Sequence, residues 1–586
     1  MSRDAMAELF DPEEMASLRQ VRRYAVPRWM IAASAERRAA GDWRGACEAA
    51  RFDVTFDRPE ITARYGPDVA GALESDLLHL VPDLVRWHLP RVLGGRSTLA
   101  TDLIVILAGY GVTADAPGAT APYLYLRTPP MVDGPQRISL RFGPLRHGGS
   151  PGTFRAGVTD WRACRHLWDA RRSDELRARA GGADRLPFLH ADGTPLGPDE
   201  LPDADPGAGD PVARDEWVTL LYQRGRVADA LAAVGIELDP AEPATPRWYR
   251  AEPQTVLARL GLDVPRLESE ARRFAELYST ARVQIGEDWR TRVLLEFTGR
   301  DSGLRIRLVE RDGAEDTPFL PPAFRQRLPD LDLLRAGVVS PAHLHPLVAG
   351  ALFPGLGTAG GPPGPTPPAP VRVRCRGEWH QVVFRDGKLD SPHSPQERQR
   401  EHALRAFGGA VTGCFAVEHS CTTGTGRLPK ALRAQRRDLF LRAQHGDTPA
   451  VLELLDAGVD PRVRDGGQRS LLHVLHLLDH EPLLPRLLAA GLDLEALDHR
   501  ERTPLCVAVS DGGSAELVSA LVGAGARIDV VDQMELSLDQ LIRRYRRTDL
   551  DFLRERVEKA HPGIGADWWD EWQAEKDDED EEGEDG

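Results

Sequence analysis

Cysteine and histidine side chains gather in the sequence at Cys414, His419 and Cys421, which form a C-x4-H-x-C pattern. Both residue types are ligands that zinc prefers, and a tetrahedral site would require a fourth ligand, for which Cys375 or His402 is the candidate. Paired CxxC motifs are absent, and reduced cysteine is among the most buried residue types. The pattern leaves two interpretations open, a metal site and packed apolar side chains, and we predict no metal site.

Three histidines further along the chain have a spacing that places them on one side of a helix. His473, His476 and His480 lie at positions i, i+3 and i+7. Such a face could gather a zinc ion, but sulfur and carboxylate ligands are not evident nearby. We expect these histidines to have structural roles.

Other patterns associated with catalysis are incomplete. Gly424–Lys430 lacks the spacing of a phosphate-binding loop, and Pro429 disrupts the helix that such a loop feeds. Asp330 and Asp332 flank a leucine, which is more typical of a helix start than of a divalent-cation site. His343–His345, between two prolines, is expected to be a packed turn. The sequence contains neither a G-x-S-x-G nor an H-E-x-x-H motif, so we predict no catalytic residue and no cofactor.

The composition is that of an acidic protein that can build apolar cores. The 586 residues carry a formal net charge of −16, and nine acidic residues lie between Glu575 and Asp585. A phosphate backbone needs a basic surface, so we expect no nucleic-acid partner. Six cysteines are too few for a disulfide scaffold in so long a chain. The first 25 residues contain no apolar signal segment, and no stretch approaches the roughly 18 apolar residues of a membrane span. We therefore expect no membrane contact and a cytoplasmic location.

A segment rich in proline divides the chain. Seven of the 17 residues from Pro354 to Pro370 are proline, which excludes a helix or a sheet and indicates a linker. A weaker break lies at Asp203–Pro211. The expected fold class is multidomain, with α+β parts followed by a helical array. The expected domains are an α+β lobe at 1–209, a second α+β lobe at 210–353, the Pro/Gly linker at 354–370, a small α+β hairpin-helix segment at 371–435, repeats at 436–561, and a Trp/acidic tail at 562–586.

Apolar periodicity and turn residues predict individual elements. Gly41 and Asp42 separate two expected helices, and a similar helical hairpin is expected at 216–233. Ser394 to Glu397 is a capping box, which predicts a helix that runs to about Phe407. Strands are expected at 103–108, 123–127, 136–142, 292–297, 304–309, 371–375 and 381–384. This irregular mixture favours α+β packing over regular βαβ winding.

The C-terminal region repeats at a fixed interval. Gly458, Gly491 and Gly525 are the middle residues of three similar five-residue motifs and lie 33 and 34 positions apart. A period of this length marks stacked units that cannot bury their apolar faces alone. The residues Asp498–Ala508, DHRERTPLCVA, resemble the ankyrin repeat, whose signature is Thr-Pro-Leu-His-x-Ala at the start of its first helix. The expected units are 436–466, 467–499 and 500–532, with a degenerate fourth near 533–561.

The resemblance implies an α-solenoid of ankyrin repeats and a role for single residues. Thr503 would be the N-cap of a first helix and Pro504 its first residue. Cys506 stands where the family has a histidine, and His473 holds that position in the preceding unit, where the family uses it to bond loop backbone. The complete chain also resembles a group of bacterial ankyrin-repeat proteins, to which we attach no activity.

Family knowledge implies that partners contact the projecting loops and the first helices. The candidate partner-binding residues are Arg464, Asp465, Gln468, His499, Arg500, Glu501, Gln533 and Met534. The favoured hypothesis is a protein-interaction protein whose repeats recruit a protein partner. The alternative is an enzyme or toxin-like effector with an active site in residues 1–353 and repeats that select its target. Trp568, Trp569 and Trp572 are expected to cover the last repeat while the acidic tail stays solvated.

Overall fold

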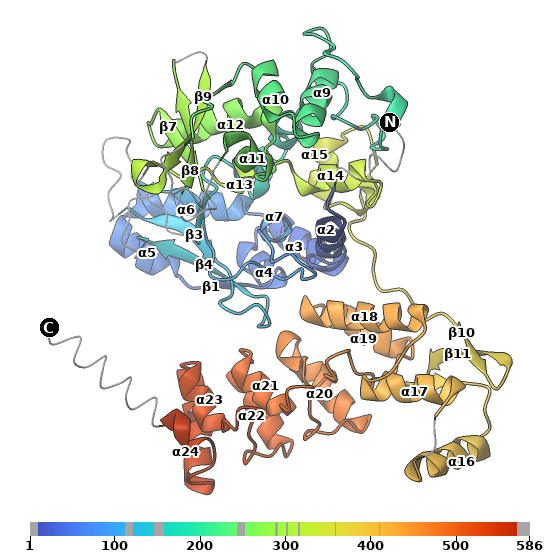
Figure 1. Ribbon diagram of the computed structural model, residues 1–586. Coiled ribbons are helices and arrows are strands. Elements are labelled where there is room, and N and C mark those ends of the chain that lie inside the picture. The colour runs from blue at the N-terminus through green and yellow to red at the C-terminus, as the bar shows by residue number, and fades with distance from the viewer. Residues whose placement is uncertain are drawn as a thin grey trace. The chain divides into compact units, whose positions relative to one another are not determined.

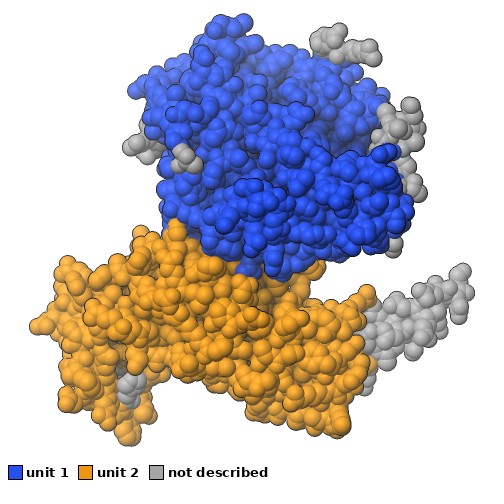
Figure 2. All heavy atoms as spheres, turned by 180° about the vertical axis from the view of Figure 1, so that it is seen from behind, with its two compact units in different colours: residues 1–129, 137–363 blue, residues 130–136, 364–586 orange. Residues whose placement is uncertain are grey.

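A computed structural model of the chain describes residues 10–111, 121–145, 157–242, 252–286, 291–299, 303–314, 317–357, 359–408 and 411–570 (Figure 1). Trp572 and the acidic run 575–585 lie outside the described residues, as do residues 300–302 and the side chain of His402. The chain divides into two compact units, which Figure 2 colours separately: residues 1–129 with 137–363, and residues 130–136 with 364–586. None of the described helices combines the length and the apolar character needed to cross a bilayer.

Two small sheets form the strand part of the first unit. The first sheet has the strand order β1 (Phe52–Val54), β4 (Ile138–Gly143), β3 (Tyr123–Arg127), β2 (Ile104–Gly109) and β5 (Val158–Asp160). Its outer pairs, β1 with β4 and β2 with β5, are parallel, and its inner pairs are antiparallel. The second sheet has the order β6 (Glu237–Leu238), β9 (Leu304–Glu310), β8 (Thr291–Phe297) and β7 (Arg282–Ile285).

The described part of this unit also contains fourteen helices. They are α2 (Pro12–Tyr24), α3 (Arg28–Ala39), α4 (Trp43–Ala49), α5 (Arg58–Tyr65), α6 (Pro67–His79), α7 (Pro82–His88), α8 (Glu175–Arg179), α9 (Pro211–Gln223), α10 (Val227–Ala233), α11 (Pro253–Ala258), α12 (Val264–Leu277), α13 (Pro322–Arg325), α14 (Pro329–Arg335) and α15 (Pro346–Leu352). Short 3-10 turns are η1 (Arg165–Leu167), η2 (Ala170–Arg172), η3 (Pro198–Glu200), η4 (Arg311–Ala314) and η5 (Pro341–His343). Two of these helices, α2 and α9, start at a proline after a capping aspartate; Asp210 precedes α9, and its carboxylate accepts the Ala213 N–H.

One apolar cluster holds the first unit together. It contains Leu84 from the first expected lobe and Phe274 from the second, so the two lobes share a core. Ala359, inside the expected linker, is also buried in this cluster. The Arg28 guanidinium donates to the Gly361 carbonyl oxygen at 3.3 Å. The first part of the expected linker is therefore packed against the first unit.

The second unit joins a hairpin sheet to a series of helices. The sheet is antiparallel and consists of β10 (Val371–Cys375), β11 (Glu378–Arg385) and β12 (Lys388–Asp390). The helices and 3-10 turns are α16 (Pro395–Ala406), α17 (Gly413–Thr423), α18 (Lys430–Gln444), α19 (Thr448–Asp456), η6 (Leu475–Leu477), α20 (His480–Ala489), α21 (Pro504–Ser510), α22 (Ala515–Gly523), α23 (Leu538–Arg544), η7 (Thr548–Leu550) and α24 (Asp551–Ala560). A single apolar cluster runs from Val371 to Trp569; it includes Leu455 and Leu521, and Leu488 packs against it.

The expected fold class is wrong. The described residues form two mixed α/β bodies with three small sheets, not a string of α+β lobes that ends in an α-solenoid of ankyrin repeats. In residues 467–499 the short turn η6 takes the place of a first helix, because the N–H groups of Leu475 and Leu477 bond to carbonyl groups three residues earlier. The hairpin sheet shares its core with the helices that follow, so residues 371–435 and the repeats are one body.

Several individual elements are confirmed. Gly41 has a φ of 75° and separates α3 from α4 as the sequence predicts. The strands expected at 292–297 and 304–309 pair antiparallel as β8 and β9. Ser394 caps α16, with the reciprocal bond from Glu397 that defines a capping box. The border between the two units, after Pro363, falls inside the expected linker, whereas the expected boundaries near residues 210 and 436 each lie within one apolar cluster.

Candidate functional site

Three turns of the second unit share one hydrogen-bonding pattern. They begin at Asp465, Asp498 and Asp532, which lie 33 and 34 positions apart. In each turn the aspartate Oδ1 accepts the backbone N–H groups of the residues two and four positions later, at 2.8–3.0 Å. The fourth residue of each turn has a positive φ, at Gln468, Glu501 and Glu535. An aspartate side chain thus closes each turn in the same way.

Neighbouring turns are also bonded to one another. The Arg464 guanidinium donates to the Leu497 carbonyl oxygen at 3.0 Å, one repeat interval away. The His499 N–H donates to the Gly467 carbonyl oxygen at 3.0 Å, and its Nδ1 lies 2.9 Å from the same oxygen. The first two turns therefore form a connected edge.

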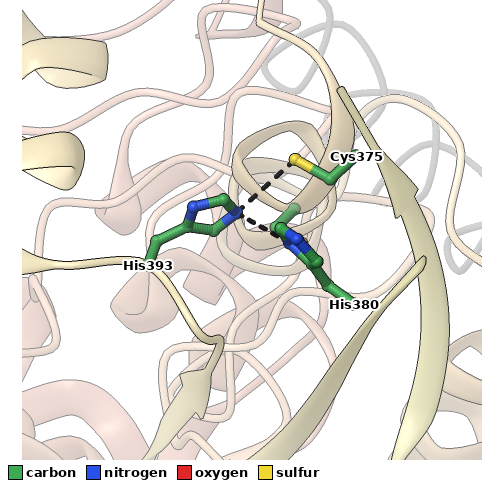
Figure 3. Close-up of side chains that lie close together, drawn as sticks. Cys375, His380 and His393 are labelled. Carbon is green, nitrogen blue, oxygen red and sulfur yellow. Dashed lines mark hydrogen bonds between the residues drawn. The ribbon is translucent and has the colours of Figure 1, made fainter. Parts of the chain in front are cut away.

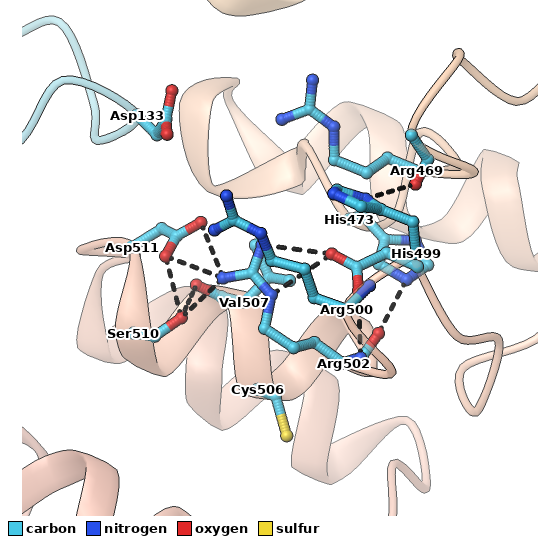
Figure 4. Close-up of polar contacts among 12 residues, drawn as sticks. Asp133, Arg469, His473, His499, Arg500, Arg502, Cys506, Val507, Ser510 and Asp511 are labelled. Carbon is cyan, nitrogen blue, oxygen red and sulfur yellow. Dashed lines mark hydrogen bonds and ion pairs between the residues drawn. The ribbon is translucent and has the colours of Figure 1, made fainter. Parts of the chain in front are cut away.

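Charged and polar side chains form ion pairs and hydrogen bonds with residues of the second turn (Figure 4). Arg502 lies 3.1 Å from both the Asp498 and the Asp511 carboxylates. Burial alone would lower the pKa of Arg502, but Asp511 and Asp498 outweigh it and the pKa is raised. His473 Nε2 lies 3.2 Å from the Arg502 carbonyl oxygen, and its Nδ1 accepts the Ser470 N–H at 3.1 Å. The turn backbone is consequently held at both ends.

The expected partner-binding residues all lie in or next to these turns. Arg464, Asp465 and Gln468 of the first turn are half-buried, and the first two are already bonded to backbone groups. The others are exposed: His499, Arg500, Glu501, Gln533 and Met534. Thr503 caps α21 by accepting the Cys506 N–H at 3.2 Å, and Pro504 is its first residue, as the sequence predicts.

A separate cluster of cysteine and histidine lies at the other end of the second unit. It consists of Cys375, His380, His393 and Cys414, whose ligand-type atoms all lie within 4.8 Å of one another. Figure 3 shows His393 pointing at both Cys375 and His380. His393 Nε2 lies 3.2 Å from His380 Nδ1 and 3.5 Å from Cys375 Sγ, and Cys414 Sγ lies 3.6 Å from His380 Nδ1. Four soft or borderline ligand atoms therefore converge on one point.

Four different elements bring these side chains together. Cys375 ends β10, and His380 lies in β11 opposite Val373, so the two side chains share one face of the hairpin. His393 directly precedes the Ser394 cap of α16. Cys414 is the second residue of α17, after Gly413, whose φ is 64°.

Gly413 permits the close approach between α17 and the hairpin. A Cβ atom on this glycine would lie 2.9 Å from Cys375 Cβ and still closer to its Sγ. A side chain at this position would therefore push Cys375 away from Cys414.

The cluster is buried, and burial shifts its ionisations. Cys375, Cys414 and His393 are at most 8% exposed. Burial, with the neighbouring Cys375 in second place, raises the pKa of the Cys414 thiol to about 12. Burial and then His380 lower the pKa of His393. The surroundings thus favour uncharged side chains unless a cation enters, because a bound cation stabilises the thiolate.

The candidate ligands of the C-x4-H-x-C pattern, at which the sequence predicts no metal site, belong only in part to this cluster. Cys414 and its candidate partner Cys375 are brought together, whereas His419 and Cys421 belong to α17 outside the cluster. Sequence reasoning missed His380 and His393. A signal for them was present, because His380 lies in an expected hairpin with Cys375 and His393 precedes the capping box.

The three histidines expected to share a helix face do not gather. His476 Nδ1 lies 3.1 Å from the His473 carbonyl oxygen, and its Nε2 lies 3.0 Å from that of Asp133, a residue grouped with this unit. His480 is the first residue of α20. The structural role expected of His473 is confirmed by its bonds to loop backbone.

The polar clusters of the first unit are internal ion pairs. Asp330 and Asp332 lie in the first turn of α14 as predicted, and Asp330 binds the Arg22 guanidinium at 2.8 Å. His345 is buried, and its Nε2 lies 2.9 Å from Asp83, whose other oxygen accepts the Ser34 hydroxyl at 2.8 Å. The carboxylate stands between hydroxyl and imidazole, so the imidazole cannot take the hydroxyl proton directly.

No protein-family model matches the chain. The resemblance to ankyrin repeats therefore rests on the residues of Asp498–Ala508 and their period, and it remains a prediction.

Proposed function

We propose that the second unit is a protein-binding module and that its partner contacts the row of turns Asp465–Arg469, Asp498–Arg502 and Asp532–Leu536. The observation that carries the proposal is the common pattern of aspartate bonds in three turns spaced by 33 and 34 residues. The sequence resemblance to ankyrin repeats, which bind proteins through such loops, supports the same function.

Rigid turns suit recognition for a physical reason. A loop whose backbone is already ordered loses little conformational entropy when a partner binds, so more of the contact energy appears as affinity. The exposed side chains Arg500, Glu501 and Met534 offer a cation, an anion and an apolar group on this edge. We also propose a cytoplasmic location, because all six cysteines are buried and free, as is usual in a reducing compartment.

The test compares two triple variants of the full-length protein. The first replaces Arg500, Glu501 and Met534 by alanine. The matched control replaces Arg556, Glu555 and Phe552 of α24, which are an exposed cation, anion and apolar residue away from the turns. Proteins captured from cells of the source organism by each variant are quantified by mass spectrometry.

We expect the turn variant to lose at least about tenfold of a specific captured protein, since a binding hot spot is worth about 2 kcal/mol or more and about 1.4 kcal/mol corresponds to tenfold. The control variant should capture as much as the wild type. Equal capture of the same proteins by both variants would contradict the proposal. Truncation at residue 435 is unsuitable as a test, because residues 371–435 share the core of the turns.

The alternative of an enzyme with an active site in residues 1–353 has no observation in its favour among the described residues of the first unit. Several of its buried charges are engaged in pairs, such as Arg22 with Asp330 and His345 with Asp83. We therefore do not propose a reaction.

A further inference from the structure

We infer that Cys375, His380, His393 and Cys414 bind one zinc ion as a closed structural site. The ligand atoms would be the two Sγ atoms, His380 Nδ1 and His393 Nε2, which all lie close together. Figure 3 shows three of the four residues, Cys375, His380 and His393. Two thiolates and two imidazoles form one of the ligand sets typical of structural zinc.

The distances fit tetrahedral coordination. In a regular tetrahedron two ligand atoms lie about 1.6 bond lengths apart, which for Zn–N and Zn–S bonds gives separations of about 3.3 to 3.8 Å. The N–N separation in the cluster is 3.2 Å, and two of the four N–S separations are 3.5 and 3.6 Å. None of the other pairs exceeds 4.8 Å, so small side-chain rotations complete the site.

Carboxylates lie beside the outward ring nitrogens of both histidines. Glu397 Oε2 is 3.8 Å from His393 Nδ1, and Glu378 Oε2 is 3.9 Å from His380 Nε2. Zinc-bound histidines usually direct their second nitrogen to such a group, which orients the ring and raises its basicity. Glu397 is itself fixed, because its Oε2 accepts the Ser394 N–H at 2.8 Å.

The helix α16 has little packing against the rest of the unit, so a bound ion would be an important attachment for it. None of the described side chains of α16 is buried, so apolar packing does not hold this helix to the rest of the unit. His393 joins its start to the hairpin through the cluster, and Cys414 joins the start of α17 to the same point. A bound ion would tie the hairpin and both helices together, which is how zinc stabilises parts with small cores.

The experiment measures the metal content of purified full-length protein by mass spectrometry. We expect about one zinc per chain. Cys414→Ser and the double variant Cys375→Ser/Cys414→Ser should lose it, whereas the matched controls His419→Gln and Cys421→Ser, on the same helix, should retain it. Retention of zinc by the double variant would overturn the inference. So would a disulfide between Cys375 and Cys414 in the intact wild-type protein.

A second measurement does not depend on the folding of any variant. Wild-type protein stripped of metal is titrated with Co²⁺, and its absorption is recorded. The expected spectrum has the intense visible bands of tetrahedral cobalt and a thiolate charge-transfer band in the near ultraviolet. Weak bands typical of octahedral cobalt, or no thiolate band, would overturn the inference.

Discussion

The buried side chain of His473 has a defined protonation state because one ring nitrogen has a hydrogen-bond donor as its partner and the other has an acceptor. Nδ1 accepts the Ser470 N–H, and Nε2 faces the Arg502 carbonyl oxygen. A proton on Nδ1 would destroy the first of these bonds. Burial, the main cause, lowers the pKa of His473 to about 4.

This low pKa predicts a loss of stability in mild acid. The unfolded chain binds a proton to His473 below its ordinary pKa of about 6.5, whereas the folded protein binds it only near pH 4. The titration of His473 therefore leaves the free energy of unfolding at its full value above about pH 6.5. Below that pH the free energy of unfolding falls, by about 2 kcal/mol between pH 7 and pH 5. His473→Gln removes this dependence.

Native-state hydrogen exchange of the α21 amides, measured from pH 5 to 7 and corrected for the intrinsic rate, checks the prediction. The exposed His499→Gln is the control and should keep the pH dependence of the wild type. Equal pH dependence in wild type and His473→Gln would show that the buried imidazole is not the titrating group.

Single residues were predicted well where a local rule applies and poorly where distant elements meet. Thr503 caps α21 because the preference of threonine for this position needs only the next turn of chain. The partners of Cys414 come instead from the hairpin and from the residue before α16, at distances in sequence that no spacing rule covers. The C-x4-H-x-C pattern was misleading because His419 and Cys421 lie on the same helix as Cys414 but outside the cluster.

At the scale of elements, the three aspartate turns differ in one respect that can be tested. Arg469 and Arg502 follow the first two aspartates by four positions and pair with them, whereas Leu536 holds that position in the third turn. The third turn therefore has the backbone bonds without the ion pair.

We predict that Asp498→Ala destabilises its turn more than Asp532→Ala destabilises the third. Both variants lose two charge-assisted bonds to backbone N–H groups, worth about 3 to 6 kcal/mol in all. Asp498→Ala also leaves the half-buried Arg502 with Asp511 as its one remaining carboxylate partner, which adds about 1 kcal/mol or more.

Hydrogen exchange of α21, which follows the second turn, and of α23, which follows the third, measures the difference in the full-length protein. The double variant Asp498→Ala/Arg502→Gln serves as the control, because it removes the ion pair without leaving an arginine partly unpaired. If the two aspartate variants had the same effect, the arginine would contribute nothing to the turn.

The element that sequence reasoning misjudged most is the stretch Leu471–Leu478. Its letters, LLHVLHLL, are apolar at almost every position, so they carry no period that distinguishes a helix from tight turns. The stretch is buried throughout and bonds three residues back rather than four. The Ser394 capping box, in contrast, is a strong local signal, and the helix that it predicts is present as α16.

At the scale of the whole molecule, each unit has its own apolar cluster, and the cluster of the second unit starts before the repeats. Gly387 in the turn after β11 donates its N–H to the Gly458 carbonyl oxygen at 3.2 Å. A Cβ on Gly458 would lie 3.0 Å from the Arg385 Cα, so this repeat glycine also admits the hairpin. The Arg464 N–H donates to the Cys421 carbonyl oxygen at 2.8 Å. The period in the sequence could not indicate these contacts, because the partner residues Arg385, Gly387 and Cys421 precede the repeats.

These contacts predict which fragments fold. A fragment of residues 364–586 keeps the whole cluster and should unfold cooperatively, whereas residues 436–586 lose Val373, Phe384, Val417 and Leu432 from it. Burying one large apolar side chain contributes about 1.5 to 3 kcal/mol, and domains are stable by only about 5 to 15 kcal/mol. The shorter fragment should therefore be unfolded or aggregated, as measured by circular dichroism and sedimentation. Both fragments lack residues 130–136, so that loss is common to them. A shorter fragment with the same thermal midpoint as the longer one would mean that the hairpin and α17 rest on the repeats without supporting them.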